Sequence, residues 1–151
     1  MNGREEKKWN DLFFVCSLIE YIARKTRNER RDIVNAMGRD GLEHYYSLAD
    51  VYHCDNIDRV TADIIAKYGI RQGSYDNLSN INGRLPTHWD IGKVMHRIIK
   101  KVTGDENGDI IEALIKVYNS WIVRKIDNYN SSMYYENDSY LYASYVAGHA
   151  L

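Results

Sequence analysis

Four residues whose side chains can transfer protons or bind metal lie close together in the first half of the sequence. They are His44, Asp50, His53 and Cys54. Asp50 and His53 are three positions apart, so on a helix the carboxylate can orient the imidazole. We expect a structural hydrogen bond between them and no metal, because metal sites need three or four converging ligands at recognisable spacing. A small-ligand or metal sensor is the alternative that this cluster would support.

A second candidate pair is Arg39 and His44, which have four residues between them. This spacing resembles the ribonuclease motif of the HEPN helical domains. The resemblance implies a histidine that acts on the 2′-hydroxyl or leaving oxygen, and an arginine that neutralises the phosphate. A chain with this many arginines and histidines contains such a match roughly once by chance. We therefore expect an exposed turn with a capping histidine, and keep a helical ribonuclease toxin as the alternative function.

Tyrosine is unusually frequent, with 13 residues in the chain. Six of them follow position 128: Tyr129, Tyr134, Tyr135, Tyr140, Tyr142 and Tyr145. Tyrosine offers a large contact area with a polar end, and it is enriched where proteins meet. We expect a protein partner to bind Tyr134, Tyr135, Tyr142 and Tyr145, together with the Asp50–His53 edge. The alternative is that the tail packs on its own helices.

Basic residues gather near positions 24–31, where the first helix is expected to end. They are Arg24, Lys25, Arg27, Arg30 and Arg31. A DNA-reading helix is not expected after them, because the segment that would fill this role begins with apolar and acidic residues. We expect a solvated patch here, with a partner of acidic surface as the next option.

Other catalytic and metal-binding patterns are missing from the sequence. The stretch from Asp105 to Asp109 is like the start of a calcium loop, but Ile110 and Lys116 replace the glycine and glutamate that the loop needs. No phosphate loop, nucleophile elbow, zinc-protease helix or dinucleotide motif occurs. We therefore favour a non-enzymatic protein and expect no cofactor.

The composition limits the class of protein further. The formal net charge is -1, so nucleic acid and anionic membranes are not expected partners. Two cysteines, Cys16 and Cys54, form no disulfide framework and fit a reducing compartment. We find no secretion signal or membrane span, and expect a cytoplasmic protein.

The spacing of apolar residues predicts an all-α single-domain bundle of about six helices. The expected elements are helices at 4–25, 28–38, 42–53, 55–69, 87–104 and 109–128, a long loop at 70–86, and a tyrosine-rich tail. Asn28 and Asp55 are expected to cap two of the helices, and Thr87 with Asp90 to form a capping box. The chain is thus one domain, 1–151, with a four-helix first half (1–69).

The first half resembles a family of small bacterial domains of unknown function that are often encoded beside proteins similar to ADP-ribosyltransferase toxins. The resemblance rests on Phe13-Phe14-Val15-Cys16, Glu20-Tyr21, Leu42, Tyr46, Asp50-Val51-Tyr52-His53, Val60 and Asp63-Ile64. It implies an antitoxin-like or accessory protein of a bacterial toxin or phage-defence locus. Its partner would be the toxin encoded by a neighbouring gene, and a homodimer is a further option.

Overall fold

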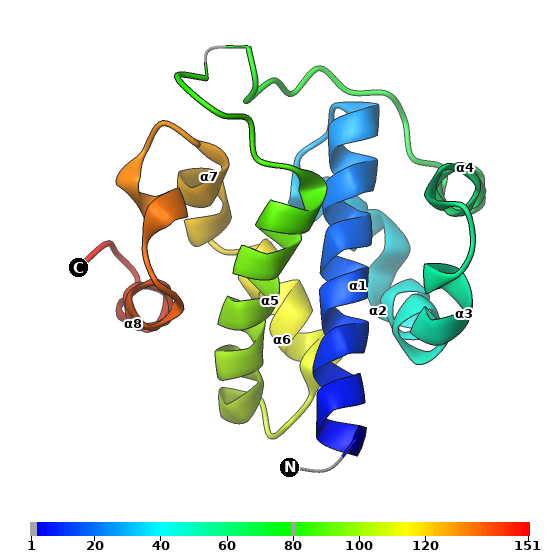
Figure 1. Cartoon of the computed structure of the whole chain (residues 1–151), viewed down its shortest axis with the longest axis horizontal. Coiled ribbons are helices and arrows are strands. Elements are labelled where there is room, and N and C mark those ends of the chain that lie inside the picture. The colour runs from blue at the N-terminus through cyan, green and yellow to red at the C-terminus, as the bar shows by residue number, and fades with distance from the viewer. Residues whose placement is uncertain (1–2, 80) are drawn as a thin grey trace.

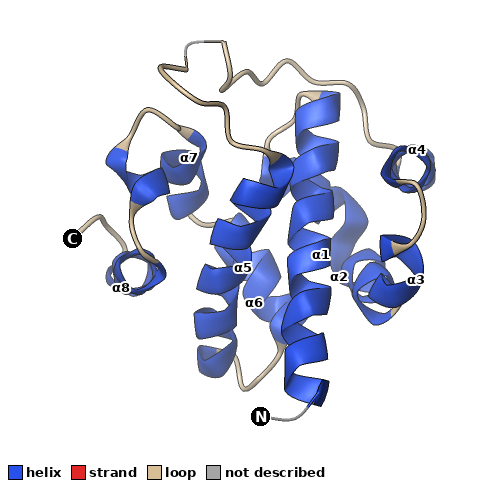
Figure 2. Cartoon of the chain, in the orientation of Figure 1, coloured by secondary structure: helices blue, strands red, loops and turns tan. Residues whose placement is uncertain are grey.

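The computed structural model describes residues 3–79 and 81–151, and every regular element in these ranges is helical (Figure 2). The elements are α1 (Gly3–Thr26), α2 (Arg30–Ser47), α3 (Ala49–His53), α4 (Ile57–Tyr68), α5 (His88–Asp105), α6 (Ile110–Tyr118), α7 (Ile122–Asp127), the 3-10 turn η1 (Ser132–Tyr135) and α8 (Asp138–Ala147). The predicted all-α fold is confirmed. It has eight α-helices in the described residues, more than the number expected.

Helices α1 and α5 lie side by side at the centre of the molecule (Figure 1). Gly92 of α5 lets the two helices approach closely, because a Cβ there would lie 2.5 Å from Ser17 Oγ and 2.9 Å from Ser17 Cα. Helix α2 packs on α1, α6 packs on α5, and α2 and α6 also meet. These four helices enclose the core.

The amphipathic stripes predicted from the sequence converge on one core. Fully buried side chains come from both halves of the chain: Leu12, Val15, Ile19, Ile22, Ile33, Leu42, Ile98, Ile99, Leu114 and Ile126. Helices α3 and α4 cover one flank of this core, and α7 and α8 lie on the opposite flank (Figure 1). The shared interior explains why the chain folds as one domain.

The segment between α4 and α5 crosses one end of the bundle (Figure 1) and is tied to the turn that follows α1. Gly73 N–H donates to Thr26 O at 2.8 Å, and Tyr75 N–H donates to Arg27 O at 2.9 Å. A Cβ on Gly73 would lie 2.3 Å from Asn28 Oδ1. This close approach requires glycine, so the long loop is held against the α1–α2 turn.

Several helix ends differ from the prediction, and side-chain hydrogen bonds explain how. Asn28 donates from its side chain to Arg71 O at 2.8 Å instead of capping α2, which starts after Glu29. Asn56, and not Asp55, caps α4, since its Oδ1 accepts from Asp58 N–H at 2.8 Å. These errors are one residue in size, because neighbouring Asn, Asp and Glu side chains compete for the same backbone donors.

Two larger differences concern helix continuity. The break predicted at Gly38 is present as a kink inside α2 (φ +67°), but the helix predicted at 42–53 is divided, because α2 ends at Ser47 and α3 begins at Ala49. The helix predicted at 109–128 is divided into α6 and α7. Between them the side chains of Asn119 and Ser120 donate to Ile115 O and Val117 O at 2.9 and 2.6 Å. Such local bonds compete with the helical pattern and end α6. The Thr87–Asp90 capping box is confirmed.

Candidate functional site

A groove of about 470 Å³ lies where α1, α3 and the start of α5 meet. Its lining residues are Asn10, Asp11, Phe13, Phe14, Ala49, Asp50, His53, Cys54 and Trp89. A second hollow of about 290 Å³ shares Phe14, His53 and Trp89 with it and extends to Ile57 and Val60 of α4. We call the two together the aromatic groove.

Aromatic rings form the walls of this groove. The ring centroids of Phe13 and Trp89 are 5.6 Å apart. The ring centroids of Phe14 and His53 are 5.8 Å apart, and these two rings meet edge to face. Trp89 is 40% exposed, which leaves a large part of its indole open to solvent. Exposed aromatic surface beside a concave site is typical of places where a partner binds.

The charges around the groove are acidic. Asp11 and Asp50 line its first part and Asp55 its second, whereas none of the described lining residues is lysine or arginine. Lys7 Nζ lies 2.7 Å from Asp11 Oδ2 and 3.2 Å from Asp50 Oδ2, so one lysine forms ion pairs with two carboxylates. The rim therefore carries surplus negative charge, which favours a ligand with basic groups.

The structure brings Asp50 and His53 to the same groove but not into the expected hydrogen bond. Asp50 pairs with Lys7, and the His53 ring packs on Phe14. The prediction of an Asp50–His53 hydrogen bond is wrong, because both side chains find partners on α1. Cys54 is exposed in the same groove. Within residues 3–79 and 81–151 there is no cluster of histidine, cysteine and carboxylate side chains that could hold a metal ion.

Arg39 and His44 serve different contacts, although they lie on the same helix. Arg39 Nη2 donates to Asp109 Oδ2 at 2.9 Å, on the α6 side. His44 Nε2 lies 2.9 Å from the Tyr52 hydroxyl, on the α3 side. Residues five positions apart on a helix point about 140° apart. His44 is half-buried within α2, so the expectation of a capping histidine in an exposed turn is wrong.

The tyrosines of the tail pack mainly on their own bundle. Tyr134 and Tyr145 are half-buried against the core. The Tyr142 hydroxyl donates to Asp105 Oδ2 at 2.6 Å and fixes α8 on α5. Tyr135 is 67% exposed. Of the four tyrosines predicted to bind a partner, Tyr135 therefore presents the most open ring, and the others also stabilise the fold.

A buried ionic network at the α1–α2 junction was missed by the sequence reasoning. Arg30 Nε donates to Glu20 Oε1 at 2.6 Å, and Arg30 Nη1 lies 3.4 Å from Asp127 Oδ2. The hydroxyl of Tyr129 accepts from Arg30 Nη2 at 2.6 Å, and that of Tyr118 donates to Glu20 Oε2 at 3.0 Å. The three charged side chains are at most 3% exposed. This network is closed to solvent and is structural.

Burial disfavours the ionised form of Asp127, and a second nearby carboxylate, Glu20, adds to the effect. Together they raise the Asp127 pKa to about 6 against the pull of Arg30. The signal that could have found the network is Glu20, a charged residue inside the otherwise apolar stripe of α1. A carboxylate in that position needs a buried cation, but nothing in the sequence identifies Arg30 as that cation.

The fold and its sites define an all-α domain with an aromatic groove and a buried ionic junction. Comparison of the chain with models of known families, with curated proteins and with solved structures gives no match. None of the described helices has the length and apolar character needed to cross a bilayer.

Proposed function

We propose that this chain is a cytoplasmic, non-enzymatic interaction module that binds a partner protein in the aromatic groove. The single observation that carries the proposal is the groove itself, in which the 40% exposed Trp89 stands beside Phe13, Phe14 and His53. Aromatic side chains in concave sites dominate the binding energy of many interfaces. The partner segment would insert an apolar side chain and carry basic residues toward Asp50 and Asp55.

The biological setting that we propose is a bacterial toxin or phage-defence locus, with this chain as the antitoxin-like or accessory component. The support is that residues on which the family resemblance rests also line the groove: Phe13, Phe14, Asp50, Tyr52, His53 and Val60. The ribonuclease alternative gains no such support, because Arg39 and His44 are engaged by different elements.

Co-expression with the product of the adjacent gene, followed by size-exclusion chromatography, tests the proposal. We expect a stable complex whose Kd rises about 30-fold or more for Trp89→Ala, the loss typical of a central aromatic contact. Asp50→Lys should also weaken binding, because it reverses a charge on the rim.

Tyr135→Ala is the matched control, since it removes an exposed aromatic ring from the tail and not from the groove. Unchanged affinity for this variant supports the groove. If Tyr135→Ala abolishes binding while Trp89→Ala does not, the partner binds the tail and the groove proposal is wrong. Separate elution of the two proteins at micromolar concentration contradicts the partnership itself.

A further inference from the structure

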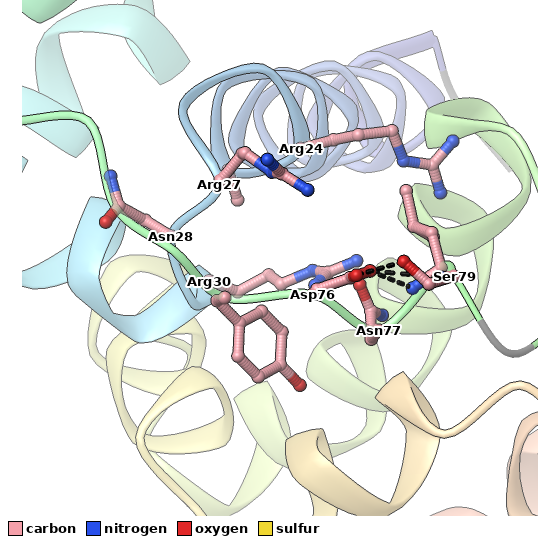
Figure 3. Close-up of a pocket in the computed structure, with 10 residues that line it drawn as sticks. Arg24, Arg27, Asn28, Arg30, Asp76, Asn77 and Ser79 are labelled. Carbon is pink, nitrogen blue, oxygen red and sulfur yellow. Dashed lines mark hydrogen bonds between the residues drawn. The ribbon is translucent and has the colours of Figure 1, made fainter.

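A pocket of about 210 Å³, separate from the aromatic groove, lies at the C-terminal end of α1, where α1, α2 and the long loop meet. Its lining consists of Ala23, Arg24, Arg27, Asn28, Arg30 and residues 75–79. Figure 3 shows Arg24 and Arg27 on one side of the pocket, with Asp76, Asn77 and Ser79 across from them. Three arginines therefore surround a space that is small for a drug-sized ligand.

Among the described residues, two of these three arginines form no ion pair, although the charge of Arg27 helps to lower the pKa of the Asp76 carboxyl. Arg30 is neutralised by Glu20 and Asp127, whereas neither Arg24 nor Arg27 forms an ion pair within the described part of the chain. The Nη2 atom of Arg24 is also shielded from solvent without a hydrogen-bond partner. A buried donor without an acceptor costs free energy, more so when the group is charged. An anion in the pocket would supply the missing acceptor.

Two carbonyl groups that could repel an anion here already accept hydrogen bonds. Thr26 O, at the end of α1, accepts from Gly73 N–H, and Arg27 O, in the turn after it, accepts from Tyr75 N–H. Their partial negative charge is therefore satisfied by hydrogen bonds.

Among the described residues that line the pocket, Asp76 is the one acid, and it also accepts hydrogen bonds. Its Oδ1 accepts from Leu78 N–H at 2.9 Å and from Ser79 N–H at 3.0 Å, and its Oδ2 accepts from the Ser79 hydroxyl. One carboxylate stands against the two free guanidinium groups of Arg24 and Arg27, so positive charge is in excess.

We propose that this pocket binds the phosphate group of a small phosphate monoester, held between Arg24 and Arg27. Arginine presents a planar fork of donors that matches phosphate oxygens, two bonds at a time. A monoester carries a charge of about −1.5 to −2 near neutral pH. This charge matches that of two guanidinium groups more closely than the single negative charge of a carboxylate does. The site is independent of the aromatic groove.

Isothermal titration with glycerol phosphate, at constant ionic strength, tests the proposal. We expect saturable binding at one site per chain. Arg27→Gln should raise the Kd about tenfold or more, because it removes charge-assisted hydrogen bonds to the phosphate. Arg24→Gln should have a similar effect. Arg27 is exposed, so its replacement should leave the fold intact.

Arg59→Gln is the matched control, because Arg59 is an exposed arginine of α4 that does not line the pocket. Its Kd should equal that of the unmodified protein. Absence of saturable binding, equal weakening by Arg59→Gln, or acetate binding as tightly as glycerol phosphate would each overturn the proposal. Titration with inorganic phosphate is a second arm of the experiment. We expect inorganic phosphate to bind as well, because the proposed contacts are to phosphate oxygens. Binding that requires the ester group would also overturn the proposal.

Discussion

Two arginines of helix α2, one at its start and one near its middle, use the same chemistry in opposite surroundings. At its start Arg30 faces Glu20 and Asp127, and nine residues later Arg39 faces Asp109 and Glu112. Each arginine thus contacts two carboxylates. The Arg30 side chain is 2% exposed, whereas that of Arg39 is 44% exposed.

This difference shows that solvent exposure determines how much an ion pair contributes to the stability of the fold. At the exposed Arg39, water can replace either partner at little cost. At the buried Arg30, loss of one partner leaves an uncompensated charge in the core. The start of α2 is therefore a junction that fixes α1, α2 and α7 together, whereas Arg39 makes an adjustable surface contact.

The largest expected effect is that of Arg30→Gln. It leaves Glu20 and Asp127 buried without their cation, and we expect a loss of about 3–5 kcal/mol in the free energy of unfolding. Urea denaturation near pH 8, where both carboxylates are ionised in the unfolded chain, measures it. A loss below about 1 kcal/mol would contradict the distinction between Arg30 and Arg39, since exposed pairs already reach that value.

The second prediction concerns pH and Asp127. Its pKa is raised from 3.8 to about 6 by burial, so the folded chain holds this proton more tightly than the unfolded chain does. The contribution of Asp127 to stability must therefore fall as pH rises from about 4 to about 6, by about 3 kcal/mol in total.

Asp127→Asn removes this titration while keeping a side chain of similar shape. The difference in unfolding free energy between the variant and the unmodified protein should thus shift in favour of the variant across that range, as followed by urea denaturation at several pH values. A difference that is constant with pH would show that the Asp127 pKa is the same in the folded and the unfolded chain.

A smaller effect is expected for Tyr75→Phe. The Tyr75 hydroxyl donates to Asp127 Oδ2 at 3.2 Å and links the long loop to the network. Its removal should cost about 1 kcal/mol, the usual worth of one hydrogen bond. Tyr135→Phe is the control, because its exposed side chain lies outside the network. Thermal unfolding of both variants compares them, and an equal Tm for the two would mean that the loop is not anchored through this bond.

The sequence predicted the helices well because their signals are local. Apolar spacing in α1 and α5 and the Thr87–Asp90 capping box depend on residues within a few positions of one another. The buried network has no local signal, since Arg30 and Tyr129 are 99 positions apart. For the same reason Arg30 looked like one more residue of a solvated basic patch. The groove lay between these cases: Asp50 and His53 were predicted, but no local signal distinguishes Phe13 and Trp89 from the other apolar residues of their helices.

The smallest effect is expected at the exposed Arg39 of α2. Arg39→Gln removes contacts to Asp109 and Glu112, but all three side chains are at least 40% exposed and can be hydrated. We expect Tm to change by no more than about 3 °C, and the remaining difference should vanish when salt screens the pair. Thermal unfolding at low and high ionic strength measures both. Because Arg30 is shielded from solvent, the loss caused by Arg30→Gln should persist at high salt, and this contrast separates a buried junction from a surface pair.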